Sequence, residues 1–200
     1  MEDIRVILAS GSPRRKQLLE QIGVRPEIRP SRIEEQAVSR LPEEVVMELS
    51  CQKAEDVAAE TAGDALVLGA DTVVAVDGDI LGKPKSHEDA MDMVRRIQGR
   101  SHQVYTGVTL IYKKQGKSRG ITFAEKTEVF VYPMTEEEMK RYADSAEPMD
   151  KAGAYGIQGA FAAYIEGIHG DYTNVVGLPV GRVCQEWKQL KEEMEDQDSD

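Results

Sequence analysis

The sequence predicts an α/β fold in which a mixed, twisted sheet is flanked by helices. Short apolar runs typical of strands alternate with segments whose apolar residues recur at helical spacing, and this alternation is typical of such folds. The chain has 200 residues, 40% hydrophobic and 30% charged, as in ordinary globular domains. It shows no internal repeat and no linker. We therefore expect one domain over residues 1–195 and an acidic, frayed tail at 196–200.

The first quarter of the chain predicts a strand, a tight loop and two helices. Residues 4–9 form a short apolar run. Ser12 suits the N-cap of the helix that follows, and Gly23 suits its C-terminal stop. A second helix is expected over residues 42–60, and Lys53 is a member of its apolar stripe.

The next segment predicts a long buried strand, a hairpin turn and a helix. Two apolar runs within residues 65–76 are interrupted at residues 70–72. The pair Asp77-Gly78 is a strong hairpin signal. Ser86 resembles the first residue of a capping box, and Gly99 ends the helix that it starts.

The second half predicts two long strands, a helix, a short strand and a closing helix. The long strands are expected over residues 102–112 and 121–132, joined by a polar turn. Thr135, with Glu138 three residues later, caps a helix that ends near residue 145. A short strand at 164–168 precedes the closing helix at 179–194.

The charge balance limits the partners of this protein. Lys and Arg number 25 against 36 Asp and Glu, giving a net charge of -11. This balance argues against a nucleic-acid partner, and any anionic ligand must meet a local basic pocket. An acidic start and the lack of a long apolar run predict neither a signal peptide nor a membrane helix, so we expect a cytoplasmic protein without a membrane partner. Cys51 and Cys184 lack metal-site spacing and are expected to be plain thiols.

The first candidate site lies where the first strand gives way to a helix. Ser10, Ser12, Arg14 and Arg15 place two hydroxyls and two guanidinium groups at this helix start. Free backbone N–H groups attract anions there, and guanidinium groups fit phosphate oxygens. The alternative is a well-capped helix that carries surface arginines.

Further charged residues could complete such a site. Asp71 lies in an apolar run, where a buried carboxylate needs a metal ion or a cationic partner unless it only marks a turn. Lys53 either extends to the rim or binds phosphate. Lys83 could be a loop lysine, and Glu34 and Glu35 solvated acids. Together, the carboxylates suit a hard cation such as Mg²⁺ and the basic side chains suit a polyphosphate.

Several familiar catalytic motifs are missing from the sequence. It contains no GxxxxGK[ST] loop, no GxGxxG after the first strand and no GxSxG elbow. His87, His102 and His169 lack the spacing of a zinc protease. We expect all three histidines to be non-catalytic.

Four segments together resemble the Maf family of nucleotide pyrophosphatases along nearly the whole chain. They are residues 8–15 (LASGSPRR), 69–74 (GADTVV), 150–159 (DKAGAYGIQG) and 175–179 (VVGLP). The resemblance implies a Maf/inosine triphosphate pyrophosphatase-like α/β fold with a central cleft. It also implies hydrolysis of a nucleoside triphosphate between the α and β phosphates, to a monophosphate and pyrophosphate.

The resemblance also implies roles for individual residues. Asp71 matches the catalytic aspartate, which takes a proton from water or helps to hold a divalent metal, Mg²⁺ or Mn²⁺. Glu35 matches the second metal-binding acid. The residues that match the phosphate-binding set are Ser10, Ser12, Arg14, Lys53 and Lys83. Those that match the substrate-selecting positions are Arg15, Thr72 and Gln158, and they look like the branch that prefers dTTP and UTP to 7-methyl-GTP. A glutamine amide can both donate to and accept from a pyrimidine edge.

Other functions stay open at this point. A non-enzymatic nucleotide-sensing or partner-binding protein is one alternative, since the family has been linked to cell division. A general phosphatase or nuclease is another. Removal of modified pyrimidine nucleotides as a housecleaning role is compatible with the resemblance, and the sequence leaves open whether two copies form a homodimer.

Overall fold

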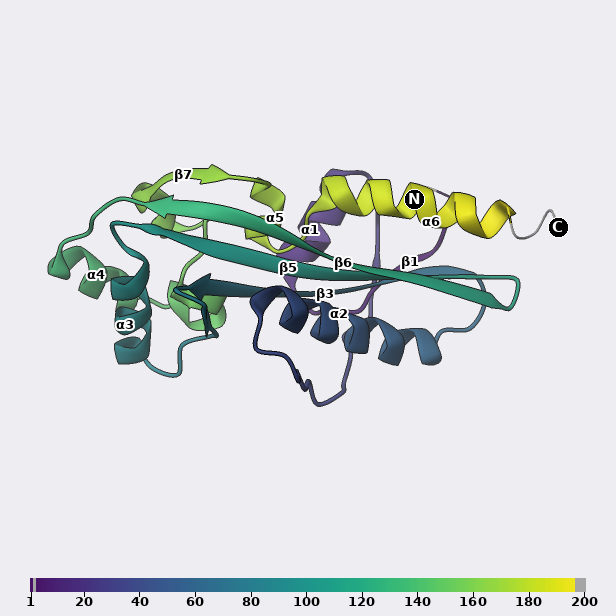
Figure 1. Ribbon diagram of the computed structural model, residues 1–200, viewed down its shortest axis with the longest axis horizontal. Coiled ribbons are helices and arrows are strands. Elements are labelled where there is room, and N and C mark those ends of the chain that lie inside the picture. The colour runs from purple at the N-terminus through teal and green to yellow at the C-terminus, as the bar shows by residue number, and fades with distance from the viewer. Residues whose placement is uncertain (2, 197–200) are drawn as a thin grey trace. The chain divides into compact units, whose positions relative to one another are not determined.

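The computed structural model describes residues 1 and 3–196, which form an α/β fold with a mixed, open sheet flanked by helices, as predicted (Figure 1). The α-helices and strands in chain order are β1 (Val6–Leu8), α1 (Pro13–Gln21), β2 (Glu27–Ile28), α2 (Pro42–Ala59), β3 (Ala65–Val76), β4 (Asp79–Leu81), α3 (His87–Ile97), β5 (Ser101–Lys114), β6 (Lys117–Val131), α4 (Glu136–Ala143), β7 (Ile165–His169), α5 (Tyr172–Val176) and α6 (Val180–Asp196). Short 3₁₀ segments lie between α4 and β7.

The sheet is mixed because its strands pair in both senses. Its hydrogen-bonded order is β2-β1-β3-β5-β6-β7, and β4 also pairs with β3. Strand β1 is parallel to β2 and to β3, whereas β4 is antiparallel to β3 and β7 is antiparallel to β6.

Contacts along the chain divide it into two compact units. The first unit comprises Met1–Asp71, Thr106–Glu125 and the chain from Gly177 onward, and the second comprises Thr72–Tyr105 and Lys126–Val176. Strands β3, β5 and β6 contribute residues to both. The single domain over residues 1–195 and the central cleft stay predictions.

Helix α1 begins and ends at the capping residues that the sequence predicted. Ser12 is its N-cap, although its side chain makes no capping hydrogen bond in the part of the chain that is described. Gly23 has a φ of 82°, and its N–H donates to the carbonyl of Glu20 (3.0 Å) while the N–H of Val24 donates to that of Leu19 (3.0 Å). This is a Schellman motif, which satisfies the last carbonyls of the helix.

The part of strand β5 that belongs to the first unit lies between two helices. Successive side chains of a strand point to opposite faces, and here Gly107 and Lys113 face α2 whereas Tyr112 faces α6. The Lys113 ammonium donates to the carbonyl of Ala58 at the end of α2 (2.8 Å), and the Tyr112 ring packs edge-on against Trp187 of α6 at 4.9 Å. Figure 1 shows α2 and α6 on opposite faces of this strand.

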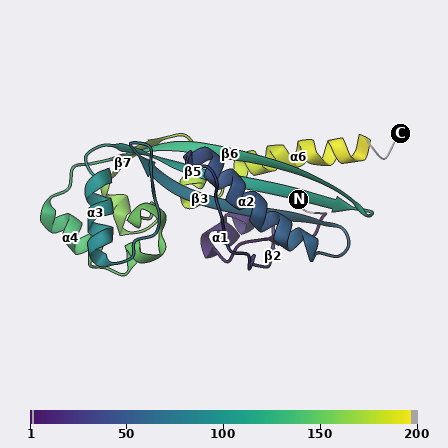
Figure 2. The same ribbon diagram turned by 60° about the horizontal axis from the view of Figure 1, so that its bottom comes forward.

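The second unit has its own apolar core. The turn between β3 and β4 has positive φ at Asp77 and Gly78, as a two-residue hairpin requires. Helix α3 packs against α4 (Figure 2), and the predicted caps form at Ser86 and, as a complete capping box, at Thr135. The buried side chains of this core include Ile97, Val129, Val131, Tyr142, Tyr155 and Phe161.

The structure corrects several predicted boundaries. Strand β3 continues through residues 70–72 without the expected interruption, because Asp71 finds a cationic partner and its backbone can stay in the strand. The sequence did not predict β2 and α5, which are two and five residues long. Helix α6 continues to Asp196, one residue into the expected tail, and residues 197–200 lie outside the described residues.

Two features of the described residues concern membrane spans and cysteines. Within residues 1 and 3–196, no helix combines the length and the apolar character that a membrane span requires. Cys51 and Cys184 are free, half-buried thiols. Neither thiol forms a disulfide among the described residues; that they bind no metal stays a prediction.

His102 is a buried histidine at the start of β5 in the second unit. Its Nε2 lies 2.7 Å from the hydroxyl oxygen of Tyr155, and the two rings pack edge-to-face. Its Nδ1 has no hydrogen-bond partner among the described residues. Burial, with a smaller effect from the positive charge of Arg100, lowers the pKa of His102 to about 4. The neutral imidazole is therefore the form that the fold accommodates.

Protonation of His102 should destabilise the fold in mild acid. The unfolded chain binds this proton near pH 6.5 and the folded chain only near pH 4, so its contribution to stability is complete above pH 6.5 and is lost as the pH falls through this window. From pH 7 to pH 5 the free energy of unfolding should fall by about 2 kcal/mol from this group alone. Urea unfolding at both pH values checks this. In His102→Gln, the fall in the free energy of unfolding between the two pH values should be smaller by this amount. An equal fall in the variant and the wild type would contradict the assignment to His102.

A side chain at Gly107 should disrupt the contact of β5 with α2. A Cβ atom there would lie 2.1 Å from the carbonyl oxygen of Val46. Gly107→Ala should therefore lower the free energy of unfolding by about 1–3 kcal/mol or more. Gly167→Ala in β7 is the matched control, because an added Cβ meets nothing within 4 Å among the described residues. Urea unfolding measures both, and equal stability of the two variants would contradict the close contact.

Candidate active site

A second close contact of α2, with β3, determines which residues meet at the candidate site. A Cβ atom at Gly69 would lie 2.3 Å from the carbonyl oxygen of Ser50 and 2.9 Å from the Cβ of Ala54, so only glycine allows this approach. Asp71 lies two residues after Gly69 and therefore on the same face of the strand. Lys53 lies in α2 between Ser50 and Ala54, the two residues that contact Gly69. The close approach of helix and strand therefore brings the Lys53 ammonium to Asp71.

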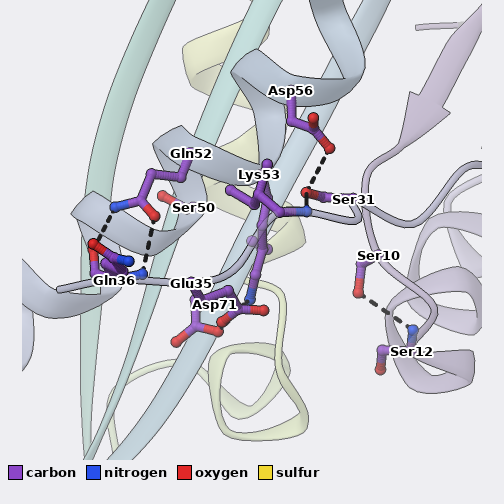
Figure 3. Close-up of polar contacts among 12 residues, drawn as sticks. Ser10, Ser12, Ser31, Glu35, Gln36, Ser50, Gln52, Lys53, Asp56 and Asp71 are labelled. Carbon is purple, nitrogen blue, oxygen red and sulfur yellow. Dashed lines mark hydrogen bonds and ion pairs between the residues drawn. The ribbon is translucent and has the colours of Figure 1, made fainter.

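Lys53 contacts two carboxylates at once. Its Nζ lies 2.7 Å from Oδ1 of Asp71 and 3.1 Å from Oε2 of Glu35 (Figure 3). The Lys53 and Asp71 side chains are 12% and 16% exposed, whereas Glu35 is 47% exposed. The prediction that Asp71 needs a partner is confirmed, and the partner is a lysine from α2. That Lys53 also binds phosphate stays a prediction.

The donors at this point fit a hard divalent cation. Asp71 and Glu35 converge on one atom from different segments of the chain, and carboxylate oxygens are the ligands that Mg²⁺ prefers. No group of three or more His, Cys, Asp and Glu side chains suited to a metal occurs among the described residues. Mg²⁺ is often held by one or two carboxylates together with substrate phosphates and water. The two acids therefore fit a cation that is shared with a polyphosphate.

Ser10, Ser12 and Arg15 at the start of α1 form a connected network. Arg15 donates through Nη1 to Oγ of Ser10 (3.0 Å) and to the carbonyl of Ala70 (2.9 Å), and through Nε to the carbonyl of Gly177 (2.8 Å). Ser10 Oγ also accepts from the backbone N–H of Ser12 (3.3 Å). Burial lowers the pKa of the Arg15 guanidinium and nearby Asp71 opposes this effect, but an arginine stays charged.

This network joins three segments that the sequence had singled out separately. Arg15 links the loop after β1 to the backbone beside Asp71 and to Gly177 before α6. Ser12 and Arg14 are half-buried in the same loop and first helical turn. The predicted roles of Ser10, Ser12 and Arg14 in phosphate binding, and of Arg15 in substrate selection, stay predictions.

The other predicted site residues belong to the second unit. Thr72 is half-buried in β3, Lys83 is exposed in the loop before α3, and Gln158 is exposed in a turn. The turn of Gln158 is shaped by Glu147, whose Oε2 accepts from the N–H of Ala160 (2.8 Å). The roles of Thr72, Lys83 and Gln158 stay predictions.

Comparison with known proteins identifies the family. The family model described as Maf-like protein matches residues 5–190. The chain belongs to the Maf-like family. It is 53% identical to the dTTP/UTP pyrophosphatase of Agathobacter rectalis, with 93% of this chain and 97% of that protein covered. It is 47% identical to the dTTP/UTP pyrophosphatase of Lachnoclostridium phytofermentans, with 93% and 95% covered.

Among solved structures, the Staphylococcus aureus Ham1 protein is similar to this Maf-like chain with a TM-score of 0.42 and 12% sequence identity. The match covers 64% of this chain and 71% of that one.

Sequence reasoning missed the residues of this Maf-like protein that hold the segment around Glu35. They are Glu48, Gln52 and Asp56 of α2, which bind the segment before the helix. Their spacing of four residues was a visible signal, since such residues share one helix face. A polar stripe beside an apolar one is nevertheless also what a solvated helix face shows.

Lys53 and Asp71 should be energetically coupled. Lys53→Met removes the cation that two carboxylates share, and should lower the free energy of unfolding by about 1–3 kcal/mol. Adding Asp71→Asn should then cost less than it does in the wild type, giving a coupling energy of about 0.5–3 kcal/mol in a double-mutant cycle. Urea unfolding of the four proteins measures it.

The exposed pair of Lys16 and Glu20 in α1, 3.3 Å apart, is the control for this cycle. Its coupling energy should stay below about 0.5 kcal/mol, as for exposed pairs at this helical spacing. Strict additivity of the Lys53 and Asp71 substitutions would contradict a direct interaction.

Proposed function

We propose that this protein is a nucleoside triphosphate pyrophosphatase that hydrolyses dTTP and UTP to the monophosphate and pyrophosphate. The observation that carries the proposal is the contact of one lysine, Lys53, with two carboxylates of a Maf-like chain. Relatives with about half of their residues identical, over nearly their full length, are dTTP/UTP pyrophosphatases. A role in removing modified pyrimidine nucleotides or in cell division is compatible with this activity.

Asp71 is the proposed proton acceptor. The Lys53 ammonium holds Oδ1 of Asp71, which fixes the carboxylate in one orientation. In that orientation Asp71 takes a proton from the water that attacks the α phosphorus, and the bond from this phosphorus to the bridging oxygen breaks. The negative charge then moves onto the departing pyrophosphate, where the charges of Arg14, Lys53 and Lys83 would stabilise it.

A divalent cation, Mg²⁺ or Mn²⁺, would be held by Asp71 and Glu35. When bound, it supplies neutralisation of the triphosphate charge and Lewis acidity at a phosphoryl oxygen. Lys53 keeps the two acids together when the phosphates are absent, since each carboxylate would otherwise repel the other.

Selection of the base is assigned to Arg15, Thr72 and Gln158. The exposed amide of Gln158 can donate to one pyrimidine atom and accept from the next. A cytoplasmic location, a homodimer and the lack of nucleic-acid and membrane partners stay predictions from the sequence.

A nucleotide panel with an Asp71→Asn control tests the proposal. Purified protein with Mg²⁺ or Mn²⁺ should convert dTTP and UTP to monophosphate and pyrophosphate, separated by ion-exchange chromatography, faster than it converts purine nucleotides. Asp71→Asn should reduce kcat by at least about 100-fold, because it removes the proton acceptor. It should stay folded by circular dichroism, because the side chain keeps its size and shape.

Three outcomes of this panel would contradict the proposal. Full activity of Asp71→Asn would remove Asp71 from the reaction. Release of orthophosphate would indicate a general phosphatase. Binding of nucleotides without turnover would indicate a nucleotide-sensing protein.

A further inference from the structure

Glu35 lies in a segment without helix or strand, between β2 and α2. We call residues 31–41 the strap. Glu35 is 47% exposed and reaches the site through its ion pair with Lys53. An ion pair with one exposed partner is partly screened by water and stabilises little, and ordering a loop costs conformational entropy. Other contacts must therefore hold the strap in place.

Next to Glu35, the side chain of Gln52 makes two hydrogen bonds to the main chain of Gln36. Gln52 Oε1 accepts from the backbone N–H of Gln36 (3.2 Å), and Gln52 Nε2 donates to the backbone carbonyl of Gln36 (2.6 Å). One side chain of α2 thus satisfies both main-chain groups of Gln36, as a neighbouring strand would (Figure 3).

Two carboxylates of α2 hold the strap on either side of this pair. Asp56 Oδ2 accepts from the hydroxyl of Ser31 (2.7 Å) and from the N–H of Arg32 (3.1 Å). Glu48 Oε2 accepts from the N–H of Val38 (2.7 Å). Later residues of the strap therefore bind earlier residues of α2. The strap thus runs antiparallel to α2, along the helix face that Glu48, Gln52 and Asp56 share.

We propose that Gln52, with Glu48 and Asp56 on either side, is a positioning residue that clamps the strap to α2 and thereby sets Glu35 against Lys53. Gln36 follows Glu35 in the chain, and Gln52 precedes Lys53. The Gln52–Gln36 hydrogen bonds and the Lys53–Glu35 ion pair therefore join consecutive residues of the strap to consecutive residues of α2. A shift of the strap by one residue along the helix would break both contacts. The consequence for metal binding rests on the proposed function, in which Glu35 is a metal ligand.

Gln52→Ala tests the clamp, with Gln189→Ala as the matched control. Gln189 is an exposed glutamine of α6 that donates to Glu193 Oε1 (3.0 Å), so its removal deletes a glutamine contact away from the strap. Hydrogen–deuterium exchange followed by mass spectrometry reports on peptides from residues 31–39. We expect Gln52→Ala to speed exchange in these strap peptides by roughly tenfold or more and to leave exchange in the peptides of α2 unchanged. Unchanged exchange of the strap would overturn the clamp.

Mn²⁺ binding, followed by the electron paramagnetic resonance signal of the free ion, tests the link to Glu35. Gln52→Ala should weaken Mn²⁺ binding by roughly tenfold, as expected when a residue that orients a metal ligand is lost, whereas Gln189→Ala should bind it as the wild type does. Faster exchange with unchanged Mn²⁺ affinity would overturn the positioning of Glu35.

A kinetic comparison distinguishes displacement of Glu35, in Gln52→Ala, from removal of its carboxylate, in Glu35→Gln. Excess Mn²⁺ should restore the kcat of Gln52→Ala, because Glu35 is displaced but still present, and should not restore that of Glu35→Gln. Equal recovery of both variants would overturn the proposal. If the wild type hydrolyses no nucleotide, the proposed function fails, while exchange and Mn²⁺ binding still decide the clamp.

Discussion

The close approach of α2 to the sheet is the constraint on which the candidate site depends. At Gly69 and Gly107 the backbone of this helix occupies the space that a side chain would need, with carbonyl oxygens of the helix 2.3 Å and 2.1 Å from the Cβ that each glycine lacks. A larger residue at either position would move the helix outward. The ammonium of Lys53 would then move away from Asp71, because that contact spans the same interface.

The same helix organises the site through two of its faces. One face packs on β3 and β5 and delivers Lys53. The neighbouring face carries Glu48, Gln52 and Asp56, which hold the strap and with it Glu35. A protein of net charge -11 thereby gathers two acids around one cation at a single point. Such a group suits a divalent cation shared with a triphosphate better than it suits a triphosphate alone, because two carboxylates repel phosphate and attract metal.

Local patterns in the sequence predicted most of the architecture, because caps and turns depend on neighbouring residues. Gly23, the Asp77-Gly78 turn and the capping box at Thr135 all lie where the sequence indicated. Strand β2 could not be predicted in this way, since two residues carry no periodicity and only pairing with β1 defines them.

For the site, the sequence predicted a set of candidate residues, and the structure shows how Lys53, Asp71 and Glu35 meet. The cost of burying Asp71 predicted a partner, but the choice of Lys53 depends on how α2 packs. The contacts of Arg15 with two backbone carbonyls have no sequence signature, because every residue has a carbonyl. Gln52 has a visible spacing but binds main chain, so its partner could not be read from residue types. The burial of His102 likewise depends on Tyr155, 53 positions away.

The most direct test of this account is a crystal structure of the protein with Mn²⁺ and a non-hydrolysable UTP analogue, in which anomalous scattering locates the metal. The account predicts Mn²⁺ in direct contact with carboxylate oxygens of both Asp71 and Glu35, and the α phosphate of the analogue beside Asp71. An ion and a nucleotide bound away from these two acids would contradict it.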